Sequence, residues 1–184
     1  MIFSKLFKYC PVCGACEIVV NNEKSMRCEC CGFTYYINAS AATAAFIQNE
    51  NGDLLACRRG KEPAKGTLDL PGGFVDNAET AEETIAREIK EELNGEVERL
   101  EYLFSLPNLY EYSGLTVPTL DMFFSCRLKS IDNLKASDDV ESLEFIPLNK
   151  LQPEDFGLMS IRKAVEIYCR STQMTQIKNV DSRR

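Results

Sequence analysis

Three glutamates have the spacing of a metal site: Glu91 and Glu92 follow Glu88 by three and four residues in a stretch with helical periodicity. At about 100° per residue, their carboxylates share an arc of about 100° on one helix face. Like charges four residues apart destabilise a helix unless something neutralises them. Mg²⁺ or Mn²⁺ would do so, because these hard cations bind carboxylate oxygens together with water and substrate phosphates. The spacing therefore predicts a divalent-cation site suited to phosphate chemistry.

The acidic helix also accounts for the charge of the chain. Nine acidic and two basic residues fall within 76–98, and this segment alone carries the net charge of −7 of the 184-residue protein. This net charge disfavours a role in coating nucleic acid, because phosphate backbones bind basic surfaces, but it does not exclude nucleotides bound through a divalent cation. The absence of histidine excludes Ser-His-Asp catalysis and leaves Cys, Asp, Glu and backbone oxygens as metal ligands.

A second cluster of chemical interest lies near the N-terminus, where six of the nine cysteines occur. Two CxxC pairs are each followed by glycine and are separated by fourteen residues. Such turns bring two thiolates to one ion, so the two pairs together predict a tetrahedral zinc site. The predicted ligands are the cysteines of these pairs, Cys10, Cys13, Cys28 and Cys31. Cys16 forms an overlapping third pair and Cys30 adjoins Cys31, and their roles stay open.

The residues between the cysteine pairs predict a short hairpin that turns at Asn21-Asn22, which is the pattern of a zinc ribbon. About 35 residues bury too little apolar surface to fold alone, so the ion would supply much of the folding free energy. A zinc ion with four cysteine ligands has no open coordination position and is structural. The remaining cysteines are expected in the core: Cys57, Cys126 and Cys169.

From residue 41 onward, short apolar strands alternate with helical segments, which predicts a mixed α/β domain. Asn51-Gly52 favours a hairpin between the first two strands. The third strand leads into Pro71-Gly72-Gly73, where the chain must turn sharply. The expected strands are 44–47, 54–57, 67–70, 100–106, 120–128 and 143–146, and a final helix is expected at 158–169.

The acidic helix has recognisable signals at both ends. Thr80, with Glu83 three residues later, predicts a capping box at its start. Asn94, followed by Gly95, can adopt the left-handed conformation that ends a helix. The buried stripe is predicted from three apolar residues spaced by four, Ile85, Ile89 and Leu93.

The residues around this helix resemble the Nudix box: Gly73, five residues, Glu79, seven residues, and then Arg87-Glu88-Ile89-Lys90-Glu91-Glu92. The preceding Leu70-Pro71-Gly72-Gly73 is similar to the same family. A four-cysteine ribbon ahead of the box resembles the zinc-ribbon group that includes the NADH pyrophosphatases. Their Ser-Gln-Pro-Trp-Pro-Phe-Pro run is absent here, where residues 105–110 read Ser-Leu-Pro-Asn-Leu-Tyr.

The resemblance implies a Nudix-like α/β/α sandwich with a mixed sheet at 39–170, preceded by the ribbon at 1–38 and followed by a polar tail at 171–184. It implies Mg²⁺-dependent hydrolysis of a phosphoric anhydride bond in a nucleoside diphosphate linked to a moiety X. ADP-ribose, NADH, dinucleoside polyphosphates and nucleotide sugars all fit X. The alternative is a non-catalytic module that senses a nucleotide sugar, with the ribbon contacting a partner or nucleic acid. Analogy also allows a homodimer.

The resemblance also assigns roles to residues of the box. Arg87 would orient the box carboxylates, and Glu79 would brace the junction between loop and helix. A later acid often joins such a site, and Asp139 is the first choice and Glu141 the second. Glu88 or that later acid would accept the proton from the attacking water. The implied ligands of the divalent cation are the Gly73 carbonyl, Glu88, Glu91 and Glu92.

Four residues outside the box are candidates for substrate binding. Arg58 and Arg59 end a predicted strand and are placed to contact a phosphate. Tyr110 and Tyr112 have the side chains to stack on a base, although alternation along a strand explains them equally well.

The sequence also bears on where the protein works. No apolar run approaches the roughly 20 residues that a membrane-spanning helix needs. The first eight residues have no long hydrophobic region of the kind found in a signal peptide. We therefore expect a cytoplasmic protein with no membrane partner.

Overall fold

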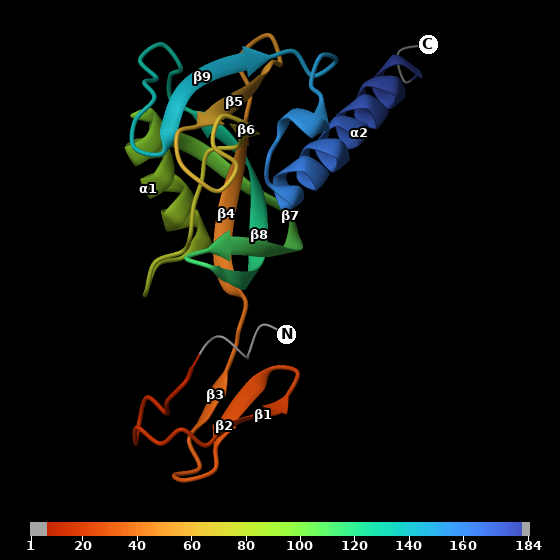
Figure 1. Ribbon diagram of the computed structural model, residues 1–184. Coiled ribbons are helices and arrows are strands. Elements are labelled where there is room, and N and C mark those ends of the chain that lie inside the picture. The colour runs from red at the N-terminus through yellow and green to blue at the C-terminus, as the bar shows by residue number, and fades with distance from the viewer. Residues whose placement is uncertain (1–6, 182–184) are drawn as a thin grey trace. The chain divides into compact units, whose positions relative to one another are not determined.

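The computed structural model describes residues 7–181, which fold into two compact units (Figure 1). The first unit is formed by residues up to Ser40 together with Leu109–Thr119. The second unit is formed by Ala41–Asn108 together with the chain from Leu120 onward. The boundaries expected from the sequence, at residues 38 and 170, stay predictions.

A three-stranded antiparallel sheet forms the ribbon, in the order β1-β2-β3. Its strands are β1 (Ile18–Asn22), β2 (Ser25–Cys28) and β3 (Thr34–Tyr36). The hairpin expected after the first cysteine pair is present, but its predicted turn was wrong. Asn22 still belongs to β1 and pairs with Ser25, and its side-chain oxygen accepts a hydrogen bond from the Lys24 backbone at 2.8 Å. The turn is therefore at residues 23–24, two residues later than predicted.

The remaining chain forms two three-stranded sheets and the helices. One has the order β4-β8-β7 and the other the order β6-β5-β9, in which β5 pairs antiparallel with both neighbours. The strands of the first sheet are β4 (Ser40–Ile47), β8 (Leu115–Leu128) and β7 (Val97–Tyr112). Those of the second are β6 (Leu68–Asp69), β5 (Leu54–Arg59) and β9 (Val140–Ile146). The helices are α1 (Ala81–Leu93), the short η2 (Pro153–Asp155) and α2 (Met159–Asp181).

The hairpin expected between the first two strands of this region was wrong. The loop does turn, since Gly52 has φ 80° and its backbone donates to the Asn49 carbonyl at 3.0 Å. The strands on either side nevertheless belong to different sheets and meet only at an isolated bridge between Gln48 and Leu54. An Asn-Gly pair turns the chain, but it does not decide which strands pair.

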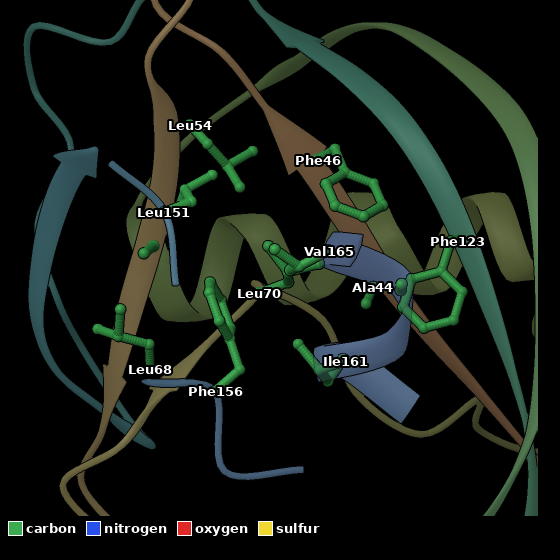
Figure 2. Packing of buried hydrophobic residues seen from close by; sticks show 12 residues of the cluster. Ala44, Phe46, Leu54, Leu68, Leu70, Phe123, Leu151, Phe156, Ile161 and Val165 are labelled. Atoms are coloured by element: carbon green, nitrogen blue, oxygen red, sulfur yellow. The ribbon is translucent and has the colours of Figure 1, made fainter. Parts of the chain in front are cut away.

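Two hydrophobic cores lie on opposite faces of β4 and β5, because successive side chains of a strand point to opposite sides. Ala44 and Phe46 of β4 belong to the core that α2 covers (Figure 2). Ala45 and Ile47 belong to the core that α1 covers. The two helices thus lie on opposite sides of the sheets, and the predicted α/β/α sandwich is confirmed.

Helix α1 forms as the sequence predicts. The Thr80 hydroxyl accepts from the Glu83 backbone, and the Glu83 side chain accepts from the Thr80 backbone, which completes the capping box. Asn94 ends the helix in the left-handed conformation, with φ 53°. The three residues of the predicted stripe, Ile85, Ile89 and Leu93, are fully buried. Each contributes about 1.5–3 kcal/mol of apolar burial, which fixes the opposite, acidic face of the helix toward the site.

Helix α2 is longer than the sequence-based expectation. It continues to Asp181 rather than ending near Cys169, so most of the predicted polar tail is helical. The chain has no glycine or proline after Gly157 to stop it. Residues 182–184 of that tail lie outside the described residues. The expectation for the isolated cysteines is confirmed, since Cys57 and Cys126 are buried and half-buried Cys169 packs against a core.

Within residues 7–181, no helix combines the length and the apolar character that crossing a membrane requires.

Candidate active site and zinc centre

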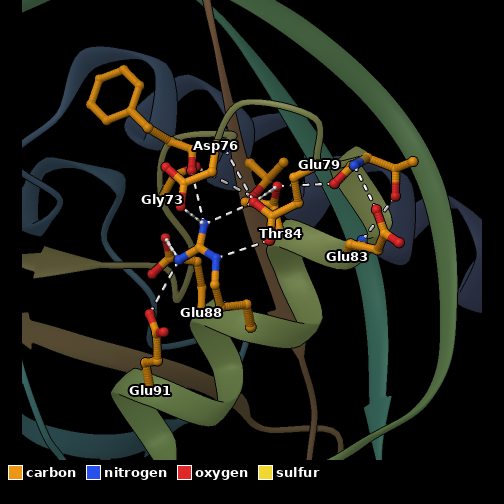
Figure 3. Close-up of polar contacts among 11 residues, drawn as sticks. Gly73, Asp76, Glu79, Glu83, Thr84, Glu88 and Glu91 are labelled. Carbon is orange, nitrogen blue, oxygen red and sulfur yellow. Dashed lines mark hydrogen bonds and ion pairs between the residues drawn. The ribbon is translucent and has the colours of Figure 1, made fainter.

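A polar network joins Glu79 to Glu88 and Glu91 of α1 (Figure 3), and the Arg87 guanidinium is its centre. Its Nε and Nη2 donate to the two carboxylate oxygens of Glu79, at 2.9 and 3.0 Å. Its Nη1 donates to Glu88 at 2.8 Å and to Glu91 at 3.1 Å. Its Nη2 also donates to the Phe74 carbonyl at 3.1 Å. One cation therefore holds three acidic side chains and the preceding loop in a fixed arrangement.

Glu79 joins that loop to the helix. Besides Arg87, its carboxylate accepts hydrogen bonds from the Thr84 hydroxyl at 2.8 Å and from the Asp76 backbone at 3.2 Å. The hydrogen bond from Arg87 is the main reason that the pKa of Glu79 falls to about 2. Glu79 therefore stays ionised at neutral pH and keeps the loop and the helix together, which is the geometry that the family resemblance implies.

The Gly72-Gly73 turn lies directly against two of the α1 carboxylates. The Gly72 backbone donates to Glu92 Oε2 at 3.1 Å. Gly72 has φ 145°, and a Cβ at this position would overlap the Thr43 backbone. A Cβ on Gly73 would overlap the Glu88 carboxylate. Gly72 therefore requires glycine, because its φ is positive and a Cβ would meet fixed backbone, whereas a Cβ on Gly73 would displace the Glu88 carboxylate.

Glu92 and Glu88 carry unusual pKa values for carboxyl groups. Burial raises the pKa of Glu92 to about 8, although the hydrogen bond from Gly72 opposes the shift. Burial also raises the pKa of Glu88, against the opposing effect of Arg87. The ionised forms of these two side chains are therefore disfavoured in the absence of a cation, and a bound cation would stabilise them. Their oxygens and the Gly73 carbonyl are the hard donors that Mg²⁺ and Mn²⁺ prefer.

In this structure the three glutamates that could hold a divalent cation contact other groups of the protein. Within residues 7–181, the cysteine cluster is the group of metal-binding side chains whose ligand atoms already converge on one point. Glu88 and Glu91 contact Arg87, while Glu92 contacts the Gly72 backbone. Small side-chain rotations would have to bring the three carboxylates onto one ion.

Asp139, the first choice for the later acid, lies next to these carboxylates. The segment before Asp139 packs on the end of α1, since the Ser137 backbone donates to the Glu92 carbonyl at 2.9 Å. The charge of Asp139 contributes to the raised pKa of Glu92. Asp139 also pairs with Lys61. Glu141, the second choice, is an exposed residue of β9.

The two arginines expected to contact phosphate are engaged with protein acceptors. Arg58 binds Glu144 and the Gly66 carbonyl, both at 2.8 Å. Arg59 donates to the Pro63 carbonyl at 2.7 Å and pairs with the buried carboxylate of Asp69. Their role in substrate binding stays a prediction.

Tyr110 and Tyr112 lie on the part of β7 that belongs to the first unit, whereas α1 belongs to the second. Tyr110 is half-buried and Tyr112 is exposed. Their stacking on a base stays a prediction.

Three polar residues near the carboxylates were missed in the sequence. Thr84 is fully buried and also donates to the Thr80 carbonyl. It precedes Glu88 by four residues, so it lies on the acidic side of α1, and the apolar periodicity of the helix gave no signal for it. Lys61 and Asp138 are 77 residues apart in the sequence and form an ion pair at 3.1 Å. No local sequence pattern predicts such a contact.

The four predicted zinc ligands converge in the first unit. The sulfur atoms of Cys10, Cys13, Cys28 and Cys31 all lie within 4.8 Å of one another. Two of the sulfur pairs are 3.7 Å apart, close to the spacing of about 3.8 Å expected for thiolates bound tetrahedrally to zinc at about 2.3 Å. Cys16 and Cys30 are exposed and do not belong to this cluster. The donor set therefore fits a structural zinc ion.

The backbone prepares this convergence in the same way at both cysteine pairs. Gly14 donates to the Cys10 carbonyl and Gly32 to the Cys28 carbonyl, both at 2.9 Å. Both glycines have positive φ, at 75° and 77°. This conformation closes each turn so that its two thiols face the same point.

Without added divalent cations, the protein is expected to lose stability as the pH rises from about 5 to 8. The pKa of Glu92 is about 8 in the folded protein against an ordinary value of 4.5, so the folded state holds this proton more tightly. The resulting stabilisation is complete below the unfolded pKa and is lost as the pH rises through the folded pKa. Urea unfolding midpoints measured across this range test the prediction. A pH dependence that is unchanged in Glu92→Gln would contradict it.

The comparisons with known proteins agree with this geometry. Residues 38–164 match the NUDIX domain family. The NAD-capped RNA hydrolase NudC of Pseudomonas aeruginosa is 25% identical over 167 residues, which are 91% of this chain and 57% of that protein. The ADP-ribose pyrophosphatase of Methanocaldococcus jannaschii is 35% identical over 123 residues, which are 65% of this chain and 68% of that protein.

A crystal structure of a NUDIX hydrolase from Nitrosomonas europaea shares the fold, with a TM-score of 0.69 at 22% identity over 91% of this chain and 93% of that one. The chain spans just over half the length of the NudC protein of Pseudomonas aeruginosa. The family match includes the glycine turn, all of α1 and the acidic network around Arg87. The chain therefore belongs to the Nudix family.

Proposed function

We propose that this protein is a divalent-metal-dependent pyrophosphohydrolase that cleaves a nucleoside diphosphate joined to a second moiety. The observation that carries the proposal is the intact acidic face of α1, where Glu88 and Glu92 lie against the Gly72-Gly73 turn and Arg87 holds Glu88 and Glu91. A protein that only senses a nucleotide has no need to bury carboxylates whose ionised form is disfavoured without a cation.

The residues around the turn would divide the work among them. Glu88, Glu91, Glu92 and the Gly73 carbonyl would hold Mg²⁺, which when bound activates the attacking water and neutralises charge on the phosphate oxygens. Arg87 keeps Glu88 and Glu91 turned toward the site. Glu79 keeps the loop that carries Phe74 against the helix through Arg87.

Glu88 is the preferred acceptor of the proton that the attacking water loses. Its raised pKa brings it nearer to neutral pH than an ordinary carboxylate, which favours proton transfer. Asp139 pairs with the Lys61 ammonium, so its carboxylate is already engaged by a cation. Glu141 is exposed on β9 and is the least supported of the three.

The relatives suggest which moieties to test first. One is named an ADP-ribose pyrophosphatase and another an NAD-capped RNA hydrolase, and both names describe a diphosphate that joins a nucleoside to a second group. ADP-ribose is our first candidate because the relative of that name has the higher identity, 35%. NAD-capped RNA would require a nucleic-acid contact, which the acidic composition disfavours.

A substrate screen tests the proposal. ADP-ribose, NADH, dinucleoside polyphosphates, nucleotide sugars and NAD-capped RNA are each incubated with the protein and Mg²⁺, and released nucleoside monophosphate is measured. We expect turnover of at least one compound, abolished by chelation of Mg²⁺ and faster at alkaline pH than near pH 6. Binding of a nucleotide sugar without turnover of any compound would support the sensor instead, and an acid optimum would contradict the proposed chemistry.

A further inference from the structure

Lys61 connects the loop after β5 to the acidic segment before β9. Its ammonium lies 3.1 Å from Asp138 Oδ1 and pairs with Asp139 as well. The neighbouring Gly60 backbone donates to the Asp139 carbonyl at 2.7 Å, so the two segments are also joined through their backbones. A Cβ on Gly60 would approach that carbonyl oxygen to 3.1 Å, which shows how closely the segments pack. Lys61 is thus held near Asp138 and Asp139 by the fold.

These two aspartates border the acidic face of α1. The segment that carries them is tied to the helix by two backbone hydrogen bonds at 2.9 Å, from Lys135 to Leu93 and from Ser137 to Glu92. The charge of Asp138 acts on Glu88 and the charge of Asp139 acts on Glu92. Lys61 therefore stands at the edge of the carboxylates that would bind the divalent cation.

The cations around this site differ in their freedom to move. Arg87 is held by Glu79, Glu88, Glu91 and the Phe74 carbonyl at one time. The side chain of Lys61 is 59% exposed and contacts carboxylates that are themselves about half exposed. Ion pairs with such exposure contribute little to stability, so the contact of Lys61 can be exchanged at low cost.

A compact ammonium on a flexible stem is suited to that exchange. Lysine binds phosphate as a point charge and can follow an oxygen as its surroundings change. A divalent cation on the neighbouring carboxylates would weaken the attraction between Lys61 and the two aspartates, because it adds positive charge close to the ammonium. A phosphate group entering the site would then be the stronger partner for Lys61.

We propose that Lys61 is a phosphate-binding residue of the substrate site. Once the divalent cation is bound, the Lys61 ammonium moves from Asp138 and Asp139 to a phosphate oxygen of the diphosphate. The inference rests on the proposed function and adds a phosphate contact to those predicted for Arg58 and Arg59. In this structure, these two arginines contact Glu144 and Asp69.

Binding of inorganic pyrophosphate in the presence of Mn²⁺, measured by calorimetry, tests Lys61 without relying on turnover. We expect Lys61→Met to weaken pyrophosphate binding by about tenfold, the effect of losing one charge-assisted contact. Lys61→Arg, which keeps the charge, should restore most of the affinity. Lys65→Met, on the same loop, is the matched control and should bind as the original protein does.

Binding of Mn²⁺ alone separates this role from a structural one. Lys61→Met should bind Mn²⁺ as tightly as the original protein or more tightly, because a competing cation has been removed. Weaker Mn²⁺ binding would mean that Lys61 only supports the aspartates, and it would overturn the proposal. Unchanged pyrophosphate affinity in Lys61→Met, or no pyrophosphate binding by the original protein, would overturn it too.

Kinetics with ADP-ribose distinguish a failure of the Lys61 proposal from a failure of the proposed function. For an active enzyme, Lys61→Met should raise KM about tenfold while kcat changes by less than about threefold, because the contact is made in both ground and transition states. A protein that binds pyrophosphate through Lys61 but turns over none of the screened compounds would contradict the proposed function and leave the phosphate contact intact.

Discussion

Glutamine in place of Glu91 or Glu92 is expected to lower kcat by about two orders of magnitude or more, or roughly 3 kcal/mol of transition-state stabilisation. The substitution keeps the size of the side chain and removes the charge that would hold Mg²⁺. The melting temperature without Mg²⁺ should be unchanged or slightly raised, because repulsion on the acidic face falls. At position 92 the amide oxygen can still accept the hydrogen bond from the Gly72 backbone.

Turnover with Mg²⁺ and melting curves without it should be measured together for these variants. Glu82→Gln is the matched control, since Glu82 is an exposed acidic residue in the first turn of the same helix. It should leave kcat unchanged. Near-normal kcat in both Glu91→Gln and Glu92→Gln would reject the catalytic assignment and favour the sensor.

The second large effect is expected in the ribbon, where Cys28→Ser should release zinc and unfold the sheet of β1, β2 and β3. Among the described residues of this ribbon, only Cys10, Ser25, Met26 and Cys28 are buried, and two of these are predicted zinc ligands. Structural zinc supplies about 10–16 kcal/mol of binding free energy in small zinc-dependent folds, far more than one buried methionine can.

Zinc content and melting curves of Cys28→Ser and Cys16→Ser provide the comparison. Cys16 is exposed and outside the sulfur cluster, so Cys16→Ser should keep one zinc ion per chain. The α/β domain has two cores of its own, and its melting transition should survive in both variants. A Cys28→Ser protein with its zinc and its ribbon intact would show that the ribbon is held in another way.

The parts of the structure that the sequence predicted well are those that short-range contacts determine. The capping box of Thr80, the stripe from Ile85 and the left-handed end at Asn94 all depend on residues within one or two helical turns. The convergence of the four cysteines follows from two local turns and a short sheet. Spacing alone therefore predicted α1 and the sulfur cluster correctly.

Contacts between distant segments could not be predicted in the same way. The pairing of Lys61 with Asp138, and of Arg58 with Glu144, depends on how β5 and β9 lie side by side. The error of the hairpin predicted between β4 and β5 has the same origin, since the apolar segments 44–47 and 54–57 carry no signal about which strand each will pair with. The family resemblance placed Asp139 near the site, but Lys61, which pairs with it, could not be identified from the sequence.

The alternation along β4 limits how the length of this protein can change during evolution. Ala44 and Phe46 fill one core while Ala45 and Ile47 fill the other, so the strand matches a small and a large side chain to each helix. Inserting or deleting one residue within β4 would send every side chain beyond that point to the opposite core. Length changes should therefore accumulate in the connection that follows β4, around exposed Asn51, where neither core is disturbed.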